Sequence, residues 1–279
     1  MTMPEASPCE ARDAAATGRW ASDCLKLEVA TYPKPGLVSH MDTGAHQDMD
    51  AALLDCSATA LEAYFADLAE AGAAGAPMGR LRAIGVAAER AMLAETGGVN
   101  THRGAIFGLG LLCAAAGFRG VYRASGTLGA IVAARWGGEI LDGPIALRSH
   151  GAEVARRHGA RGARAQAAAG FPAIYDVALP ALSLGRRLVP GDAEAARVQA
   201  CMSLIAEVED TNLLYRGGLE GLAFARRRAR RFLDEGGVGS ADWRVRAAAI
   251  HEAFVERRLS PGGSADLLAM ALFVDGIGA

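Results

Sequence analysis

Residues 192–209 read DAEAARVQACMSLIAEVE, and their spacing decides the fold class. Apolar side chains recur there every three or four positions, at Ala195, Val198, Cys201, Met202, Ile205 and Val208. In an α-helix this spacing places them on one broad face, whereas a half-buried strand would alternate with period 2. The stretch therefore predicts an amphipathic helix that buries a wide face.

The same period extends along almost the whole chain, and β-branched alternation is scarce. Helices are expected over residues 13–31, 49–71, 79–95, 103–116, 127–136, 145–157, 173–188, 193–209, 218–234, 241–258 and 264–275. No repeat of fixed period and no long linker divides the sequence. We predict one all-α domain over residues 13–279, a bundle of about ten or more helices, after a poorly ordered segment over residues 1–12.

Length, composition and net charge exclude several classes of protein. With 279 residues, 51% hydrophobic and 22% charged, the chain can bury a substantial core and is not disordered. A net charge of −2 gives no broad basic field for nucleic acid. The sequence shows neither a signal-peptide pattern nor an uncharged apolar run that would span a membrane. Five widely spaced Cys without a CxxC pair are typical of a cytoplasmic protein with reduced thiols and no zinc site.

Five segments interrupt the helical pattern with glycine, proline and polar residues. In the first, YPKPGLV (32–38) is followed by GAHQDMD (44–50). Two prolines stiffen the backbone around Lys34, and a pre-positioned ammonium suits a phosphate ligand. Asp48 and Asp50 open a helix, where one can cap and the other can face Mg²⁺ on a polyphosphate. The alternative is that Asp48 is only an N-cap and His46 a turn residue.

The second segment, ETGGVNTHRG (95–104), ends one helix in two glycines and begins the next with polar side chains. Asn100, His102 and Arg103 beside the free N–H groups of a helix start make an anion site, unless the segment is a surface loop. The third segment, residues 161–172, carries Arg164 between Gly162 and Pro172. Its alternative is a solvated connection.

The fourth segment, EVEDTN (207–212), places acids at a helix end that prefers cations, and continues into YRGG (215–218). Such a violation suggests a site or a metal centred on Asp210, the alternative being a frayed, hydrated helix end. In the fifth, SPGGSADLL (260–268), N–H groups entering a helix can cradle phosphate, or the segment is a plain capped turn. Together the segments predict a polar cavity formed by helix ends and Gly-rich loops.

These segments also carry a family resemblance. PKPGLV with GAHQDMD, GVNTHRGAIFGLGLL, GARAQAAAGFP, DTNLLYRGG and SPGGSADLLA, in this order across residues 28–275, resemble the triphosphoribosyl-dephospho-CoA synthases. Two positions depart from the family pattern: Arg103, where Lys is frequent, and Gln166, where an acid is frequent. The resemblance implies transfer of the 5-triphosphoribosyl group of ATP to the 2′-hydroxyl of 3′-dephospho-CoA, with release of adenine. The product is the prosthetic-group precursor of an acyl carrier protein, that of malonate decarboxylase being favoured over citrate lyase.

Such a reaction must bind a triphosphate, stabilise positive charge on the ribose and manage two protons. We expect phosphate and substrate contacts from Lys34, His46, Asn100, His102, Arg103, Arg164, Asn212, Arg216, Ser260, Gly262, Gly263 and Ser264. Asp48, Asp50 and Asp210 are the candidate Mg²⁺ ligands. Asp48, Asp50, Glu89 and Asp210 are the candidate catalytic carboxylates, with Asp210 or Glu89 near the sugar. Asp266 is expected to cap or orient.

Two other functions remain open at this point, and a homodimer is compatible with the sequence. One is a Mg²⁺-dependent all-α nucleotide N-glycosyl hydrolase, in which water replaces the acceptor hydroxyl. The other is a non-catalytic helical module that binds CoA or a carrier protein, which leaves the acids of DMD and EDTN without a role. An HD-type metal phosphohydrolase is disfavoured because no His-Asp dipeptide occurs.

Overall fold

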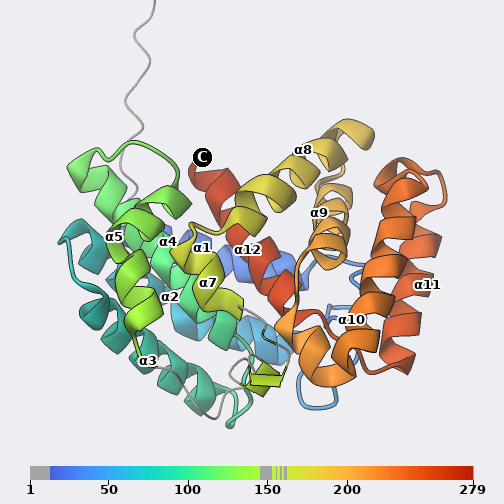
Figure 1. Ribbon diagram of the computed structural model, residues 1–279, viewed down its shortest axis with the longest axis horizontal. Coiled ribbons are helices and arrows are strands. Elements are labelled where there is room, and N and C mark those ends of the chain that lie inside the picture. The colour runs from blue at the N-terminus through green and yellow to red at the C-terminus, as the bar shows by residue number, and fades with distance from the viewer. Residues whose placement is uncertain (1–12, 145–152, 155, 158, 160–161, 279) are drawn as a thin grey trace, which may run out of the picture.

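The computed structural model describes residues 13–144, 153–154, 156–157, 159 and 162–278 (Figure 1). Over these residues the chain forms helices and no β-strand, which confirms the all-α prediction. The α-helices are α1 (Ala14–Val29), α2 (Ala51–Ala73), α3 (Met78–Glu95), α4 (Arg103–Tyr122), α5 (Leu128–Asp142), α7 (Gly162–Ala168), α8 (Leu179–Leu188), α9 (Ala193–Glu207), α10 (Thr211–Asp234), α11 (Trp243–Glu256) and α12 (Gly262–Ile277). A π-helical turn η1 (Ala173–Ala178) and a 3₁₀ turn η2 (Gly237–Gly239) complete the set. The segment 1–12 and most of the expected helix 145–157 lie outside the described residues.

The expected helices fall close to the observed ones, with two exceptions. Helix α10 begins at Thr211 rather than at residue 218, because a short helical segment from Thr211 precedes a break at Gly218, after which the expected helix follows. Gly218 adopts φ 60° and ψ −160°, which kinks α10 within its length. The short helix α7 was not expected, since residues 162–168 carry no wide apolar face.

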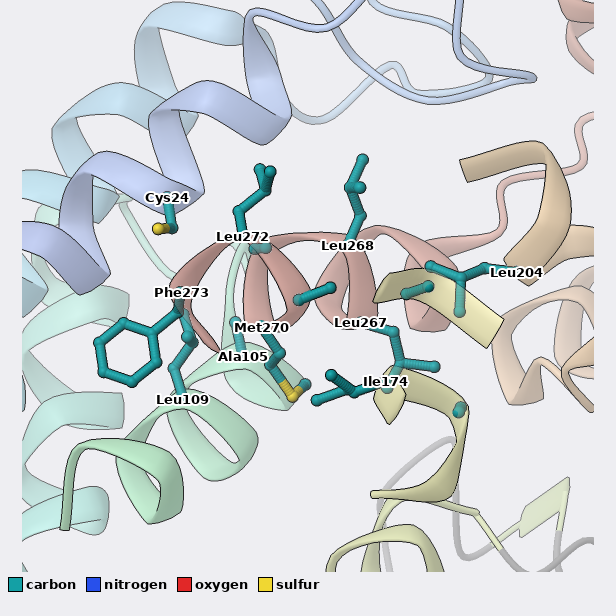
Figure 2. Packing of buried hydrophobic residues seen from close by; sticks show 14 of the residues in the cluster. Cys24, Ala105, Leu109, Ile174, Leu204, Leu267, Leu268, Met270, Leu272 and Phe273 are labelled. Carbon is teal, nitrogen blue, oxygen red and sulfur yellow. The ribbon is translucent and has the colours of Figure 1, made fainter. Parts of the chain in front are cut away.

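Helix α12 runs through the centre of the domain (Figure 1). Its sequence is apolar on nearly all sides, as a helix surrounded by others requires. It packs against α1, α4, α9 and η1. Figure 2 shows Leu268 and Phe273 of α12 pointing in different directions into this core, with Leu109 of α4 and Ile174 of η1 as neighbours. Each such buried side chain contributes about 1.5–3 kcal/mol.

Helices α2 and α4 approach so closely that only glycine fits at two contacts. A Cβ on Gly72 of α2 would lie 1.9 Å from the carbonyl oxygen of Ala114, and one on Gly117 of α4 would lie 1.9 Å from that of Ala69. By length and composition α4 is apolar enough to cross a membrane, but 56% of its apolar window is buried inside the protein, as in a core helix. The glycines therefore let α4 sit deep in the domain, and its N-terminus lies where the site forms.

We predict opposite effects for two Gly→Ala substitutions in helices. Gly72→Ala should lower the free energy of unfolding by about 2–3 kcal/mol, because the new methyl group overlaps the Ala114 carbonyl. Gly85→Ala in α3 is the matched control, since no atom lies within 4 Å of its Cβ position. It should raise stability by about 0.5–1 kcal/mol through the entropy of the unfolded chain. Urea unfolding monitored by circular dichroism measures both, and equal effects would contradict the close-packing argument.

Candidate active site

The ends of three helices meet at a cavity of about 1020 Å³. Its wall includes residues 100–104 at the start of α4, residues 209–212 at the start of α10, and Ser260, Gly262 and Gly263 at the start of α12. The remaining wall comes from α1, from the segment between α1 and α2 with Leu54 of α2, from α7, and from Phe171 and Pro172 before η1. A helix N-terminus carries unpaired N–H groups and about half a positive charge. Three of them around one cavity favour a ligand with several negative charges.

Asp210 joins two of these helix ends. Its Oδ1 accepts the N–H groups of Asn212 (2.9 Å) and Leu213 (3.3 Å), and so caps α10. Its Oδ2 accepts the N–H (2.7 Å) and the hydroxyl (2.9 Å) of Ser264 in α12. Burial raises the pKa of Asp210, and hydrogen bonds from Ser264, Leu213 and Asn212 oppose that rise. With four donors on its two oxygens, Asp210 acts as a clamp between helices and also lines the cavity.

Lys34 does not line the cavity, contrary to our expectation that it binds phosphate. Its fully buried ammonium donates to the carboxylate Oε1 of Glu28 (2.5 Å) and to the Glu28 carbonyl oxygen (2.5 Å). His251 holds the same segment through a hydrogen bond from Nδ1 to the Lys34 carbonyl oxygen (2.6 Å). It is Glu28, at the end of α1, that lines the cavity.

A second group of side chains lies where the α1–α2 segment meets α10 and α12. His46 Nε2 is hydrogen-bonded to Ser260 Oγ (2.9 Å), and His46 Nδ1 is 3.2 Å from Asp48 Oδ1. Arg216 donates to the Ala45 carbonyl oxygen (3.1 Å), and its guanidinium lies against the His46 ring. Burial and the charge of Arg216 lower the pKa of His46, whereas Asp48 opposes the shift. All four of His46, Asp48, Arg216 and Ser260 line the cavity, as expected.

The start of α4 presents a neutral histidine. Ser57 Oγ is hydrogen-bonded to His102 Nδ1 (2.9 Å) and to Thr101 Oγ1 (2.7 Å). Burial lowers the pKa of His102 to about 4, so near neutral pH it offers a hydrogen bond and no positive charge. Asn100 accepts the Arg103 N–H (3.2 Å) and so holds the start of the helix. Asn100, His102 and Arg103 all line the cavity, and Asn212, Gly262 and Gly263 line it as well.

Four further residues expected in the site, Asp50, Glu89, Arg164 and Ser264, make contacts within the protein. Asp50 caps α2 by accepting the Leu53 N–H (2.9 Å) and does not line the cavity. Glu89 forms an ion pair with Arg103 (2.5 Å) outside the cavity lining. Arg164 donates to carbonyl oxygens at the C-terminal end of α5, including that of Gly143 (2.8 Å). Ser264, in turn, is occupied by Asp210.

The expected metal trio does not assemble. Over the described residues, no group of three or more His, Cys, Asp or Glu side chains is arranged to hold a metal ion. Of Asp48, Asp50 and Asp210, only Asp48 combines a place in the cavity wall with a mostly exposed side chain (60%).

Two acidic residues of the wall escaped the sequence analysis as candidates for the chemistry. Glu28 lies on the buried face of α1, where an unpaired acid would be costly, and this burial is the signal that could have drawn attention to it. Asp266 of α12 was expected only to cap or orient. Its Oδ2 would lie 2.1 Å from a Cβ on Gly104, so it sits directly against the start of α4.

The chain is similar to known proteins over nearly its whole length. Residues 14–279 match the CitG family, described as ATP:dephospho-CoA triphosphoribosyl transferase. The chain belongs to this family. A relative from Stutzerimonas stutzeri, named probable 2-(5''-triphosphoribosyl)-3'-dephosphocoenzyme-A synthase, is 41% identical over 91% of this chain and 89% of its own. A relative from Pectobacterium atrosepticum, named 2-(5''-triphosphoribosyl)-3'-dephosphocoenzyme-A synthase, is 42% identical over 88% and 84%.

No solved structure gave a significant match. The family resemblance seen in the sequence is thus confirmed, and the protein is a transferase of the CitG family. The matched region includes all three helix starts that line the cavity.

The clamp role of Asp210 predicts a large loss of stability in Asp210→Ala. Three buried N–H groups and the Ser264 hydroxyl would lose their acceptor, at a cost of about 3–5 kcal/mol. Asp50→Ala is the matched control, because it removes one exposed N-cap and should cost about 1 kcal/mol. Urea unfolding compares the two variants, and similar losses would rule out the clamp. Asp50→Ala should also leave catalytic activity intact.

Neutral His102 predicts a pH dependence of stability. Its pKa is about 4 in the folded protein and about 6.5 in the unfolded chain, so the unfolded chain binds more protons between these values. Its contribution is therefore constant above pH 6.5 and decreases as the pH falls towards 4, by about 3 kcal/mol in total. His102→Gln should flatten this part of the profile, whereas His40→Gln, at a half-exposed histidine, should not. Parallel unfolding profiles for all three proteins would contradict the prediction.

Proposed function

We propose that the protein transfers the 5-triphosphoribosyl group of ATP to the 2′-hydroxyl of 3′-dephospho-CoA and releases adenine. The observation that carries the proposal is the convergence of three helix N-termini on one cavity of about 1020 Å³. Ligand pockets typically occupy about 300–1,000 Å³, so this cavity is large enough for a nucleotide substrate. The family description names the same two substrates.

A small set of hydrogen-bond donors and positive charges in the cavity wall binds the phosphates. Gly262 and Gly263, the first residues of α12, line the cavity, and no hydrogen bond from the described residues occupies their N–H groups. Arg103 and Arg216 supply the positive charges from α4 and α10. A planar guanidinium can bind two phosphate oxygens at once. Neutral His102 adds a hydrogen bond without charge.

The residues fit Mg²⁺ as a partner of the triphosphate rather than as a resident ion. Mg²⁺ keeps several waters and binds nucleotides with one or two protein carboxylates, and the exposed carboxylate of Asp48 in the cavity wall meets that need. When bound, Mg²⁺ would neutralise phosphate charge. Arg216 and His46 beside Asp48 orient this carboxylate.

The reaction breaks the bond between the ribose C1′ and the adenine nitrogen, and positive charge develops on the sugar. Carboxylates in the cavity wall stabilise that charge, because an ion is only weakly screened in a partly enclosed site. The apolar wall, with Leu37, Val38, Phe107 and Phe171, limits the water that can compete with the acceptor hydroxyl.

The proposal is tested by incubating the protein with Mg²⁺, ATP and dephospho-CoA. We expect adenine and a product heavier than dephospho-CoA by the triphosphoribosyl group, both identified by mass spectrometry. Omitting dephospho-CoA should abolish adenine release. Release that continues without the acceptor would instead favour the N-glycosyl hydrolase, and no turnover with tight binding would favour a non-catalytic module.

The downstream partner is a finer part of the proposal. We assign the product to the acyl carrier protein of malonate decarboxylase rather than to that of citrate lyase, a choice supported only by the alanine- and arginine-rich composition. The neighbouring genes distinguish the two pathways.

A further inference from the structure

Three acidic side chains in the cavity wall, Glu28, Asp266 and the exposed Glu209, have no part in phosphate binding or in clamping helices. The two that are not exposed are Glu28 at the end of α1 and Asp266 in the second turn of α12. They come from different helices and face the same cavity. The surroundings of Glu28 favour a carboxylate, whereas those of Asp266 favour a protonated carboxyl group.

Glu28 is held as a carboxylate. The residue is only 8% exposed, and its Oε1 accepts a hydrogen bond from the buried ammonium of Lys34. A buried ammonium needs a negative partner, so the pair is an ion pair. Among the described residues, no hydrogen bond occupies Oε2 of Glu28, although the residue lines the cavity. One oxygen is therefore fixed by Lys34, and the other is available to a ligand.

The surroundings of Asp266, in contrast, favour its protonated form. It has no cationic partner among the described residues, and its carboxyl lies against Gly104 and accepts the N–H of Ala105 at the start of α4. Burial raises the pKa of Asp266 well above its ordinary value, and the negative charges of Glu28 and Asp210 raise it further. The Ala105 N–H only partly opposes this. Asp266 therefore holds its proton to a higher pH than an ordinary aspartic acid does, which makes it the proton donor of the two.

Other titratable and charged groups surround the pair, and none of them reverses this arrangement. They are Lys34 after α1, His102 and Arg103 at the start of α4, Cys201 of α9 and Asp210 at the start of α10. His102 is neutral, Arg103 is paired with Glu89, and Lys34 is paired with Glu28. Burial raises the pKa of the Cys201 thiol to about 12, so it stays uncharged.

We propose that Glu28 and Asp266 are the acid–base pair of the transfer reaction, with Asp266 as the proton donor and Glu28 as the proton acceptor. The assignment rests on the proposed function. It replaces Glu89 and Asp210, which the structure commits to other contacts. A neutral and an ionised carboxyl in one cavity are the combination that glycosyl transfer uses.

The step balances as follows. The C1′–N9 bond of ATP breaks, its electron pair goes to adenine, and the proton of Asp266 is transferred to the departing base. The 2′-oxygen of dephospho-CoA forms the new bond to C1′, and its proton goes to Oε2 of Glu28. Asp266 ends as a carboxylate and Glu28 as an acid. One proton passing from Glu28 to Asp266, directly or through solvent after product release, restores the starting state.

Lys34 is a positioning residue in this scheme. It does not touch the cavity, but its ion pair keeps Glu28 ionised next to two other acidic groups. This role explains why an ammonium is buried beneath a site whose substrates are anionic.

The first test measures the pH dependence of kcat for adenine release. The wild-type profile should be bell-shaped, because Glu28 must be ionised and Asp266 protonated. Asp266→Asn should lower kcat by about 10²–10⁴-fold and abolish the decrease on the alkaline side. Glu28→Gln should lower kcat similarly and abolish the decrease on the acid side. Asp67→Asn and Glu70→Gln, at exposed positions of α2, are matched controls and should behave as wild type.

The second test separates proton donation from structural support. An ATP methylated at N7 has a base that is already cationic and leaves without a proton. It should restore turnover to Asp266→Asn to within about tenfold of wild type, but not to Glu28→Gln. Non-enzymatic release of the methylated base is subtracted with a sample that lacks protein.

The third test deals with the buried charge that Glu28→Gln leaves on Lys34. The double variant Glu28→Gln/Lys34→Met removes both charges and should fold, as circular dichroism and cooperative unfolding will show, yet remain inactive. Lys34→Met alone should keep partial activity and lower kcat more than it raises KM for ATP or dephospho-CoA, because Lys34 acts through Glu28 and does not line the cavity. A purely structural role for Lys34 would change kcat and KM together with the fraction of folded protein.

The outcomes are distinguishable from failure of the proposed function. If wild type releases no adenine from ATP with dephospho-CoA, the proposed function itself is wrong. If wild type is active but Asp266→Asn and Glu28→Gln keep kcat within threefold and both sides of the profile, the acid–base pair is wrong. Equal failure of both variants with N7-methylated ATP would overturn the role of Asp266 as proton donor.

Discussion

The site depends on one buried carboxylate. Asp210 accepts four hydrogen bonds, two from the start of α10 and two from Ser264 in α12. A carboxylate between two helix N-termini lies in the positive field of both, which favours its charged form. The clamp fixes the first turns of α10 and α12 side by side, and these turns carry Asn212, Arg216 and the Gly262–Gly263 amides into the cavity. The clamp therefore links the position of the core helix α12 to the arrangement of the residues that line the cavity.

The charged side chains of the cavity wall are consistent with a site in which helix N-termini supply the positive potential. Among the described residues, its wall contains two arginines but five acidic residues, namely Glu28, Asp48, Glu209, Asp210 and Asp266. Polyphosphate substrates would be repelled if side-chain charges alone decided binding. Helix N-termini and backbone amides supply positive potential without mobile side chains, and so leave room for carboxylates that act on the sugar. This arrangement explains how a chain of net charge −2 can hold two anionic nucleotides.

The sequence predicts most of the fold, and it predicts which polar segments face the cavity but not which side chains pair with one another, for different physical reasons. Apolar periodicity is a property of each helix alone, so α9 is visible from residues 192–209 without knowledge of its neighbours. Polar segments at helix starts are equally local, and this is why Asn100, Arg103, Asn212 and Gly262 were found. The partner of a polar side chain is not local. Lys34 faces Glu28 rather than phosphate.

The same limit explains the other errors. Arg164 and Asp50 look like binding residues in sequence, but one satisfies carbonyls of α5 and the other an amide of α2. Glu28 and Asp266 lie within regular helices, where a single acid resembles an ordinary surface residue. Only the packing of α1, α4 and α12 around the cavity shows that they face inward.

Burial of Lys34 has a practical consequence for the chemistry of the whole molecule. The chain contains two lysines, and only Lys26 is partly exposed on the folded protein. An amine-reactive reagent therefore meets the side chain of Lys26 in the native state, while the ammonium of Lys34 is shielded by its own fold. Covalent labelling at Lys34 counts the molecules in which the end of α1 has opened. The protein thus carries an internal reporter of local opening next to its cavity.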